Sequence, residues 1–333
     1  MSNNSKLFYV VGDTLKDVSG FTTNYKRSDN KDGLGQEFSF DLVCNPIDKY
    51  YGDTKLDMGG KVLFENNGVQ VFVGVIKEIK RRGLTDYSYT CYDFAWYLNK
   101  DEVFIQFNQC TAKSAIEQIC AAKNIEAGTI SDSLITPITK IYNGETVSDT
   151  IKDIMKQCTD ESGKKYKMEV RGKKLFIEDY GELTMKAVYK PAPSMAEFDV
   201  TVVPAEFSAS YSIADRVDKV VVISSSEKES QVLAEASNDG DISTYGALVH
   251  YEKVDKKNSA QAGQIAKTKL AELNKIKEER QLKLFGDDSV RAGRILEFNQ
   301  PDIDMVGKFL VVECSHEYNQ NTHIMTCKFE RSE

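Results

Sequence analysis

Two histidines and two cysteines near the C-terminus have side chains that can bind a metal ion. His316 and His323 flank a turn, and Cys314 and Cys327 lie just outside them. Imidazole nitrogen and thiolate sulfur are common zinc ligands in proteins. An antiparallel hairpin brings all four side chains to one face if its register places Cys314 beside Cys327. A zinc site is therefore conceivable at this hairpin.

The surroundings of these four residues argue against a metal. The register that best aligns apolar side chains makes this face mainly apolar, and no ligand pair has zinc-finger spacing. We therefore expect reduced thiols and partly buried histidines, no metal site, and zinc only as the alternative. The expected register places Leu310, Val312 and Cys314 with Met325, Cys327 and Phe329.

No recognisable catalytic or phosphate-binding motif is present. The sequence lacks Gly-x-Ser-x-Gly, His-Glu-x-x-His, paired Cys-x-x-Cys and Gly-x-x-x-x-Gly-Lys-Ser/Thr. The Asp/Gly-rich segments 28–33 and 237–240 lack the oxygen ligands that complete a calcium loop and are typical of turns. Carboxylates are plentiful, but no pattern selects a pair for acid–base catalysis. We expect no enzyme activity and no cofactor.

The densest basic cluster is Lys80-Arg81-Arg82, at the expected tip of a hairpin. Charged side chains at such a tip discourage wrong pairing of strand edges. Contact with an acidic protein surface is the alternative. No ladder of aromatic residues for base stacking accompanies the cluster, so nucleic acid is the least favoured partner.

A second candidate is the aromatic segment 92–98, which contains the only tryptophan of the chain. Helical spacing would place Tyr92 near Trp96. We expect the segment to fill the space where a strand-rich region meets the next module, and a platform for a ligand is the alternative. The candidate packing or interface residues are Tyr92, Trp96, Tyr97, Lys80, Arg81 and Arg82.

The composition indicates a globular chain of 333 residues, long enough for two or three domains. Lys and Arg total 43 against 51 Asp and Glu, a formal net charge of −8, which argues against sequence-specific nucleic-acid binding and membrane attraction. The polar start and the lack of an apolar run of about 18 residues predict neither an export signal nor a spanning helix. The seven scattered cysteines are typical of reduced thiols, and we expect assembly in the cytoplasm.

The first half of the chain changes character once. Residues 1–100 alternate apolar and polar positions around Asn/Gly turns, as antiparallel hairpins of a barrel or sandwich do. Residues 101–180 predict a small α/β module whose helices begin at Thr111 and Thr146, because each threonine can cap the apolar stripe that follows.

The second half returns to strands. Residues 181–333 contain several apolar runs and one helical pattern over 259–278 whose other face is Lys, Glu and Gln. The polar stretch from 226 to 244 predicts an exposed loop or hairpin end.

A weak internal repeat relates the two strand-rich regions. Each copy begins a strand with glycine, forms a hairpin and ends with a Thr-Cys pair. We infer a duplication, so that the chain contains two similar barrels; a chance likeness between hairpins is the alternative. The repeat aligns Gly60-Lys61-Val62-Leu63-Phe64, Val73-Gly74-Val75-Ile76 and Tyr89-Thr90-Cys91 with Gly293-Arg294-Ile295-Leu296-Glu297, Val306-Gly307-Lys308-Phe309 and Met325-Thr326-Cys327.

An ordered series of short motifs resembles the baseplate hub proteins of contractile phage tails and phage-tail-like bacteriocins, of the XkdQ type. The resemblance covers most of the chain, although each motif alone is weak. The motifs are Cys91 to Leu98, the Thr-Ala-x-x-Ala-Ile helix start at Thr111, Tyr142 to Ile151, Ser162-Gly163-Lys164-Lys165-Tyr166 and Ser212 to Val217.

The resemblance implies an α+β, mainly β fold with two similar tail-tube-like antiparallel β-barrels, an inserted α/β module and one long surface helix. Its domains would be 1–100 and 181–333 for the barrels and 101–180 for the insertion. Three chains would then form a ring of six similar barrels. The ring would adapt a sixfold tail tube to a threefold spike within a tail particle.

The resemblance supplies no catalytic residues, no cofactor and no metal. It implies as partners a homotrimer, the tail-tube protein, the spike and other baseplate proteins. Two other functions stay open: a tail-associated cell-wall hydrolase and a monomeric ligand-binding module that uses the aromatic segment.

Overall fold

The computed structural model describes residues 3–45, 47–48, 54–185, 206–224, 231–254, 261–319 and 322–332. The chain is mainly β with added helices, which confirms the predicted α+β class. It divides into two units, 1–207 with 281–333 and 208–280. No helix among the described residues is long and apolar enough to cross a membrane.

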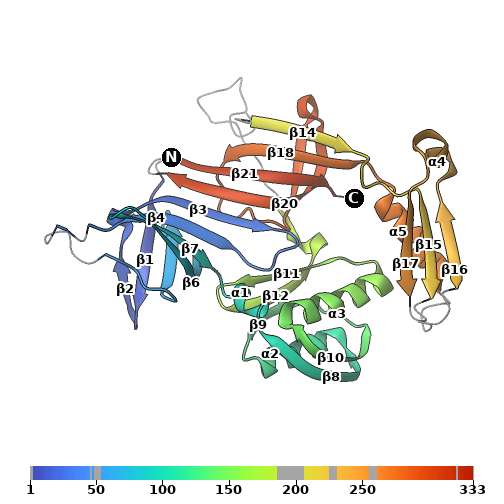
Figure 1. Cartoon of the computed structure of the whole chain (residues 1–333), viewed down its shortest axis with the longest axis horizontal. Coiled ribbons are helices and arrows are strands. Elements are labelled where there is room, and N and C mark those ends of the chain that lie inside the picture. The colour runs from blue at the N-terminus through green and yellow to red at the C-terminus, as the bar shows by residue number, and fades with distance from the viewer. Residues whose placement is uncertain are drawn as a thin grey trace. The chain divides into compact units, whose positions relative to one another are not determined.

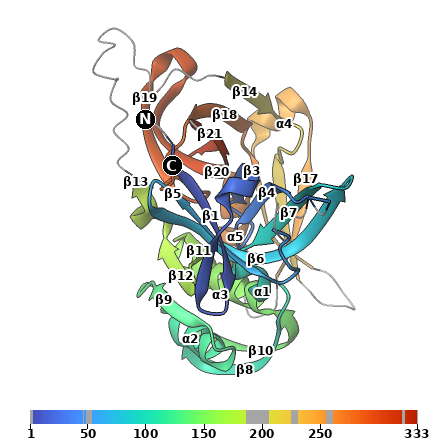
Figure 2. The same ribbon diagram turned by 90° about the vertical axis from the view of Figure 1, so that its left-hand side faces the viewer.

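The first unit is built on one large sheet, whose strands β21, β20 and β3 run side by side in Figure 1. From β18 onward the strand order is β18-β21-β20-β3-β4-β7-β6-β5-β1-β2, and β19 pairs with β20. The elements of its first half are β1 (Ser5–Val11), β2 (Thr14–Asp17), η1 (Ser19–Phe21), β3 (Thr22–Asn30), β4 (Glu37–Val43), β5 (Lys61–Asn66), β6 (Val69–Arg82) and β7 (Asp86–Tyr92). Figure 2 turns this half, including β1 and β6, toward the viewer.

The second half of the sheet repeats the strand order of the first. The pairs β3–β4, β4–β7, β7–β6 and β6–β5 correspond to β14–β18, β18–β21, β21–β20 and β20–β19. We call these two five-stranded sets the first and second copy. The second-half elements are β13 (Thr184–Met185), β14 (Glu206–Ser212), β18 (Lys277–Phe285), β19 (Ile295–Gln300), η4 (Pro301–Ile303), β20 (Met305–Asn319) and β21 (Thr322–Arg331).

Local irregularities recur at equivalent places in the two copies. The register shifts after Ile76 in β6 and after Val311 in β20, so both long strands carry a bulge at the same point. Gly59, with a φ of 79°, donates its N–H to the carbonyl of Ile76, and Gly293, with a φ of 88°, donates to that of Val311. Shared order, bulge and glycine indicate a true duplication.

The residue alignment expected from the sequence was nevertheless wrong in detail. The structural equivalent of Gly293 is Gly59 and not Gly60, and the equivalent of Cys91 is Phe329 and not Cys327. The second error is a shift by two residues. Side chains two positions apart face the same side of a strand, so this shift preserves the apolar pattern. The first is a shift by one, between the neighbouring glycines Gly59 and Gly60.

Two apolar cores lie against the same sheet. The first contains Phe38, Phe40 and Phe64 of the first copy, and the second contains Phe309 and Phe329 of the second copy. The two copies join where β20 pairs antiparallel with β3, from Glu313 opposite Asn30 to Tyr318 opposite Tyr25. We call this junction the seam.

The α/β module packs its helices on a hairpin-like pair of strands, β8 and β10, as Figure 1 shows. The predicted helix starts are confirmed: Thr111 Oγ1 accepts from the N–H of Ser114, and Thr146 Oγ1 accepts from that of Asp149. The elements are α1 (Ala95–Leu98), β8 (Glu102–Thr111), α2 (Ala112–Ala122), β9 (Glu126–Ile130), β10 (Pro137–Thr146), α3 (Val147–Ser162), β11 (Tyr166–Arg171), β12 (Lys174–Asp179) and η2 (Tyr180–Leu183).

The second unit corrects one expectation. The polar stretch 226–244 was expected to be an exposed loop or a hairpin end. Part of it forms β16 (Val232–Ser237), which pairs antiparallel with the strand before it, and α4 (Asp239–Tyr245), which was not expected; 225–230 lie outside the described residues. β16 pairs with β15 (Lys219–Ser224), which also pairs with β17 (Val249–Val254). The helix expected over 259–278 is described as α5 (Ala262–Leu273), which packs Ala262 and Ala266 on this small sheet.

A buried ion pair ties the α/β module to the second copy. Glu169 on β11 is 4% exposed, and its two carboxylate oxygens accept from Arg294, at 2.7 and 3.2 Å. Burial alone would raise the pKa of Glu169, but Arg291 and Arg294 outweigh burial and lower this pKa to about 2. Beside this pair, Lys167 Nζ donates to the carbonyl of Lys31 at 2.8 Å.

We expect Glu169→Ala to lower the free energy of unfolding by about 3–5 kcal/mol, because it leaves Arg294 buried without its partner. Urea unfolding at pH 7 measures this loss. Glu126→Ala in the same three-stranded sheet is the control: its exposed pair with Lys174 should contribute less than about 1 kcal/mol.

The same pair makes stability depend on pH. Because the folded pKa of Glu169 lies below the ordinary value of 4.5, its contribution is present above that pH and is lost as the pH falls toward 2. Equal, small losses for Glu169→Ala and Glu126→Ala would contradict the role of the buried pair.

Candidate functional site

The large sheet has one apolar face and one polar face. Along β3, β4, β7, β20 and β21, buried side chains alternate with exposed or half-buried polar ones. The buried set forms the two cores, so the other set forms a continuous hydrophilic surface across the seam. This polar face consists of Lys26, Ser28, Glu37, Ser39, Asp41, Glu78, Lys80, Ser88, Thr90, Tyr92, Glu313, Ser315, Glu317, Thr326 and Lys328.

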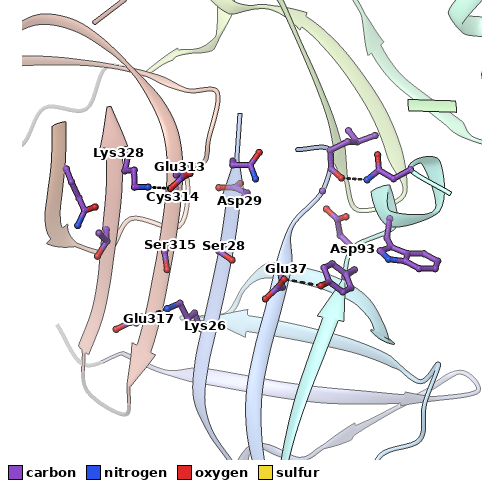
Figure 3. A pocket seen from close by; sticks show the side chains of 18 residues that line it. Lys26, Ser28, Asp29, Glu37, Asp93, Glu313, Cys314, Ser315, Glu317 and Lys328 are labelled. Atoms are coloured by element: carbon purple, nitrogen blue, oxygen red, sulfur yellow. Dashed lines mark hydrogen bonds and ion pairs between the residues drawn. The ribbon is translucent and has the colours of Figure 1, made fainter. Parts of the chain in front are cut away.

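Charges on the polar face are paired across neighbouring strands. Lys26 Nζ lies 3.3 Å from Glu317 Oε1 across the seam, and Lys328 Nζ lies 2.6 Å from Glu313 Oε2. Figure 3 shows these two pairs beside each other, with Ser28 and Ser315 between them. Both pairs are roughly half exposed, so each stabilises the fold only slightly. The result is a wettable surface without a strong field of either sign.

A groove of about 600 Å³ crosses this face next to the seam. Figure 3 shows Lys26 and Glu317 at one part of its lining and Asp93 at another. The lining mixes acids, bases, small hydroxyl side chains and two aromatic rings. It lacks the apolar walls that usually enclose a small ligand.

The aromatic candidates lie together, but not through helical spacing. Tyr92 is still in β7, and the helix α1 covers only Ala95–Leu98. Tyr92 and Trp96 both line the groove, and the Tyr92 hydroxyl donates to Glu37 Oε2 at 3.1 Å. Within α1, Ala95 and Leu98 are the side chains that fill the core of the α/β module.

Trp96 and Tyr97 hold a lysine between their rings. Lys77 Nζ lies 4.1 Å from the Trp96 ring centroid and 4.4 Å from that of Tyr97. It also donates to the Tyr97 hydroxyl at 3.1 Å. This cation–π contact fixes the two aromatic rings against the bulged part of β6.

The basic candidates do not form one patch. Lys80 lies on the polar face and pairs with Glu78 at 3.2 Å. Arg81 points to the opposite side of β6, where its guanidinium lies over the Tyr87 ring at 5.6 Å. Arg82 is exposed at the end of the strand. Strand alternation separates consecutive residues, so contact with an acidic surface would use at most part of the cluster.

Asp93, in the middle of the aromatic segment, is a buried carboxylate at the edge of the groove. It is 6% exposed; its Oδ2 accepts from the N–H of Gln36 at 2.9 Å and its Oδ1 accepts from that of Ala95 at 3.1 Å. Burial raises its pKa to about 6 despite these bonds. Gly35 makes room for the carboxylate, since a Cβ there would lie 2.7 Å from Oδ1.

The histidine and cysteine candidates do come together, on the core side of the seam. Cys314 lies opposite Cys327 with sulfurs 3.2 Å apart, as the expected register required. The same register was expected to place Leu310 and Val312 on this face. The bulge after Val311 breaks the alternation, so Val311 is buried instead, and this part of the prediction was wrong. His316 Nδ1 and His323 Nε2 are 2.9 Å apart. Burial lowers the pKa of both histidines, so both rings are neutral.

Asp288 joins this cluster from a loop between β18 and β19. Its Oδ1 lies 3.8 Å from His323 Nε2. Nothing in the sequence pattern indicated Asp288, because it lies 28 residues before His316 and only the fold brings the loop to the hairpin.

We expect Asp93→Asn to reveal a pH-dependent contribution to stability. A folded pKa raised from 3.8 to about 6 means that the native state favours the protonated acid. The free energy of unfolding of the wild type, minus that of the variant, should therefore be largest below pH 4. This difference should fall by on the order of 2 kcal/mol as the pH rises through 6.

Urea unfolding of both proteins between pH 4 and 7 measures the Asp93 effect. Circular dichroism first establishes that the variant is folded at each pH. A difference in unfolding free energy that is constant or grows with pH would contradict the burial argument.

The solved structures with the same fold include phage tail proteins. The 43 kDa tail protein of prophage MuSo2 from Shewanella oneidensis matches with a TM-score of 0.70 and 12% identity, over 98% of each chain. A tail protein from Neisseria meningitidis MC58 matches with a TM-score of 0.69 and 14% identity, over 99% of this chain and 97% of that one. At such identities the likeness establishes the fold.

A third match is the prophage tail protein gp18 from Listeria monocytogenes EGD-e. Its TM-score is 0.59 at 10% identity, over 98% of this chain and 95% of that one. No curated protein sequence matches this chain. One family model does, and it spans residues 26–330, nearly the whole sequence. The chain therefore belongs to the YQBQ-like family.

Proposed function

We propose that this protein is the structural hub of a contractile-tail baseplate, in which three copies form a ring between tail tube and spike. The observation that carries the proposal is the duplicated strand order of the large sheet. Two equivalent five-stranded copies per chain would give six in a trimer. Such a ring would present sixfold quasi-symmetry to a tube and threefold symmetry to a spike. In this proposal, 1–100 and 181–333 supply the tube-like domains and 101–180 the insertion.

The seam supplies a template for closing the ring. Inside the chain, β20 of the second copy pairs with β3 of the first. In the first copy the strand equivalent to β20 is β6, and in the second copy the strand equivalent to β3 is β14. β14 ends the sheet, and beyond Ile76 only β7 pairs with β6 among the described residues. We therefore expect residues 78–82 of one chain to pair with β14 of the neighbouring chain, as β20 pairs with β3 at the seam.

Unpaired edges of this length favour such pairing. A free strand edge presents unsatisfied N–H and C=O groups that recruit another strand. Ring closure satisfies them all, as a closed barrel does. The bulge at Ile76 and Glu78 sets the direction of the free segment, just as the bulge at Val311 and Glu313 directs β20 toward β3.

The polar face then lines the channel of the ring. It crosses the seam without interruption, and its charges are paired locally. The polar face has three lysines, five carboxylates and several small hydroxyl groups, so the wall would be wettable and slightly acidic, with no strong binding site for a passing acidic polymer. The groove beside the seam would then be a shallow depression in the channel wall.

Two other functions make different predictions. A cell-wall hydrolase needs a pair of carboxylates in a cleft, and it would release fragments from purified peptidoglycan. A monomeric ligand-binding module would keep the mass of one chain at all concentrations and in the presence of a tube protein. Five carboxylates line the groove, and each already has a partner. Glu313 and Glu317 pair with lysines, Asp29 pairs with Arg291, Glu37 accepts from the Tyr92 hydroxyl, and Asp93 accepts two backbone N–H groups. The groove therefore favours neither function.

The ring can be tested with proline variants at the free edge. The N–H groups of neighbouring residues on a strand point to opposite edges. One of the variants Lys80→Pro and Arg81→Pro therefore removes an N–H that faces β7. The other removes an N–H that faces the outer edge. We expect the outward variant to fold like the wild type but to lose trimer formation, because proline cannot pair there.

Mass photometry of the chain, alone and mixed with its tail-tube protein, measures assembly. Lys80→Ala and Arg81→Ala are the matched controls and should still form trimers, because backbone groups carry the pairing. Trimers that survive both proline variants would contradict pairing through this edge. A chain that stays monomeric with the tube protein present would contradict the hub itself.

A further inference from the structure

The core side of the seam contains a polar cluster between the two apolar cores. His316 is 1% exposed and lies between the second core, through Cys314, and the first core, through Tyr318. The Tyr318 ring stacks on His323 and on His316, with centroids 4.2 and 6.1 Å apart, and the two imidazoles are tilted by 38° with centroids 5.1 Å apart. Two imidazoles beside a carboxylate form an arrangement that metal sites use.

We propose that Asp288, His316 and His323 form a binding site for one divalent transition-metal ion of the zinc class. One ligand atom from each side chain lies within 4.8 Å of the other two. The inference is independent of the hub function and departs from the expectation of no metal that the sequence favoured.

The distances suit a zinc ion after small side-chain movements. Zinc bonds of about 2.0–2.1 Å in a tetrahedron place neighbouring ligand atoms about 3.3 Å apart. His316 Nδ1 and His323 Nε2 are 2.9 Å apart, and His323 Nε2 and Asp288 Oδ1 are 3.8 Å apart. Rotations that move each atom by less than about 1 Å would bring all three to this spacing. The fourth position would be left to water, as in other three-ligand zinc sites.

The groups around His316 hold it in the form that binds a metal. Its Nε2 lies 3.0 Å from the carbonyl of Val290, which can only accept, so Nε2 carries the proton and donates. The Nδ1 lone pair then accepts from the N–H at His323 Nε2, 2.9 Å away. A bound zinc ion would replace that proton, and His323 would carry its N–H on Nδ1 instead. Metal-binding histidines usually donate their second ring N–H to such a carbonyl.

Asp288 is held in the same way. The Tyr318 hydroxyl donates to its Oδ1 at 2.6 Å, and Asn66 Nδ2 donates to its Oδ2 at 2.7 Å. Arg27, the nearest guanidinium, donates to the main-chain carbonyl of Asp288 and not to its carboxylate. Among the described residues, no lysine or arginine pairs with this carboxylate, so a bound cation would supply its missing counter-charge.

The position of the His323 ring depends on a glycine. A Cβ on Gly286 would lie 2.1 Å from the imidazole ring, and the N–H of Gly286 donates to the carbonyl of His323 at 2.7 Å. The ring is therefore packed against bare backbone. Asp288 keeps a quarter of its side chain exposed, which gives an ion a path from solvent.

The cysteines are a competing ligand set that the experiment must distinguish. Cys314 Sγ lies 3.1 Å from His316 Nε2, on the side of the ring that donates to Val290. Cys314 Sγ therefore lies on the opposite side of the imidazole from Nδ1, the atom that faces the other two ligands.

Zinc binding to the purified full-length chain tests the proposal. The chain is stripped with a chelator, loaded with Zn²⁺, dialysed against metal-free buffer and analysed for metal content. We expect one zinc ion per chain, and at least a tenfold loss of affinity in Asp288→Asn and in His323→Asn. His250→Asn, which removes the one histidine outside the cluster, is the control and should bind as the wild type does.

Two further readouts separate a built site from chance binding. Zn²⁺ at about 100 times its Kd should raise the Tm of the wild type by about 5 °C and leave the Tm of Asp288→Asn unchanged. Co²⁺ in place of zinc should give visible absorption bands without sulfur-to-metal charge transfer. The absence of stoichiometric zinc in the wild type, or equal binding by the wild type and Asp288→Asn, would overturn the proposal; strong sulfur-to-cobalt bands would overturn the ligand set.

Discussion

The pairing of β20 with β3 is the contact on which the rest of the structure depends. Both strands would otherwise present a free edge, and their backbone groups would be left to water or to another chain. Joined, they align the two copies so that both apolar cores lie on one side and one uninterrupted polar face on the other. The seam also lies beside the cluster of His316 and Asp288, and it is the pattern on which we propose that β6 pairs with the next chain.

Local elements of this fold could be predicted from the sequence, because their causes are local. Thr111 and Thr146 begin helices by accepting a backbone N–H three residues on, and Asn67 and Gly68 turn a hairpin with positive φ. The strand order could not be predicted, since it depends on pairings between residues hundreds of positions apart. The polar stretch contains β16 because this strand pairs with β15 and packs Ala234 and Ala236 against the core of the second unit, tertiary contacts that its polar composition does not reveal.

In the candidate sites, too, the features with local causes could be predicted and those that depend on tertiary contacts could not. Strand alternation and hairpin register placed Cys314, Cys327 and both histidines on one face, as expected. The same alternation splits Lys80 from Arg81, which the sequence analysis could have used but treated as one cluster. Asp288 and Asp93 were missed because tertiary contacts give them their roles: a loop carries Asp288 to the hairpin, and Asp93 is buried by the backbone around Gly35.

The central claim is that one chain contributes two equivalent wall segments, so that three chains form a closed ring of six. Electron cryomicroscopy of the assembled hub, reconstructed with no more than threefold symmetry imposed, tests it most directly. The account predicts six superimposable five-stranded segments around one channel, with β6 of each chain hydrogen-bonded to β14 of the next and the polar face toward the channel. A ring closed through other strands, or segments that do not superimpose, would contradict it.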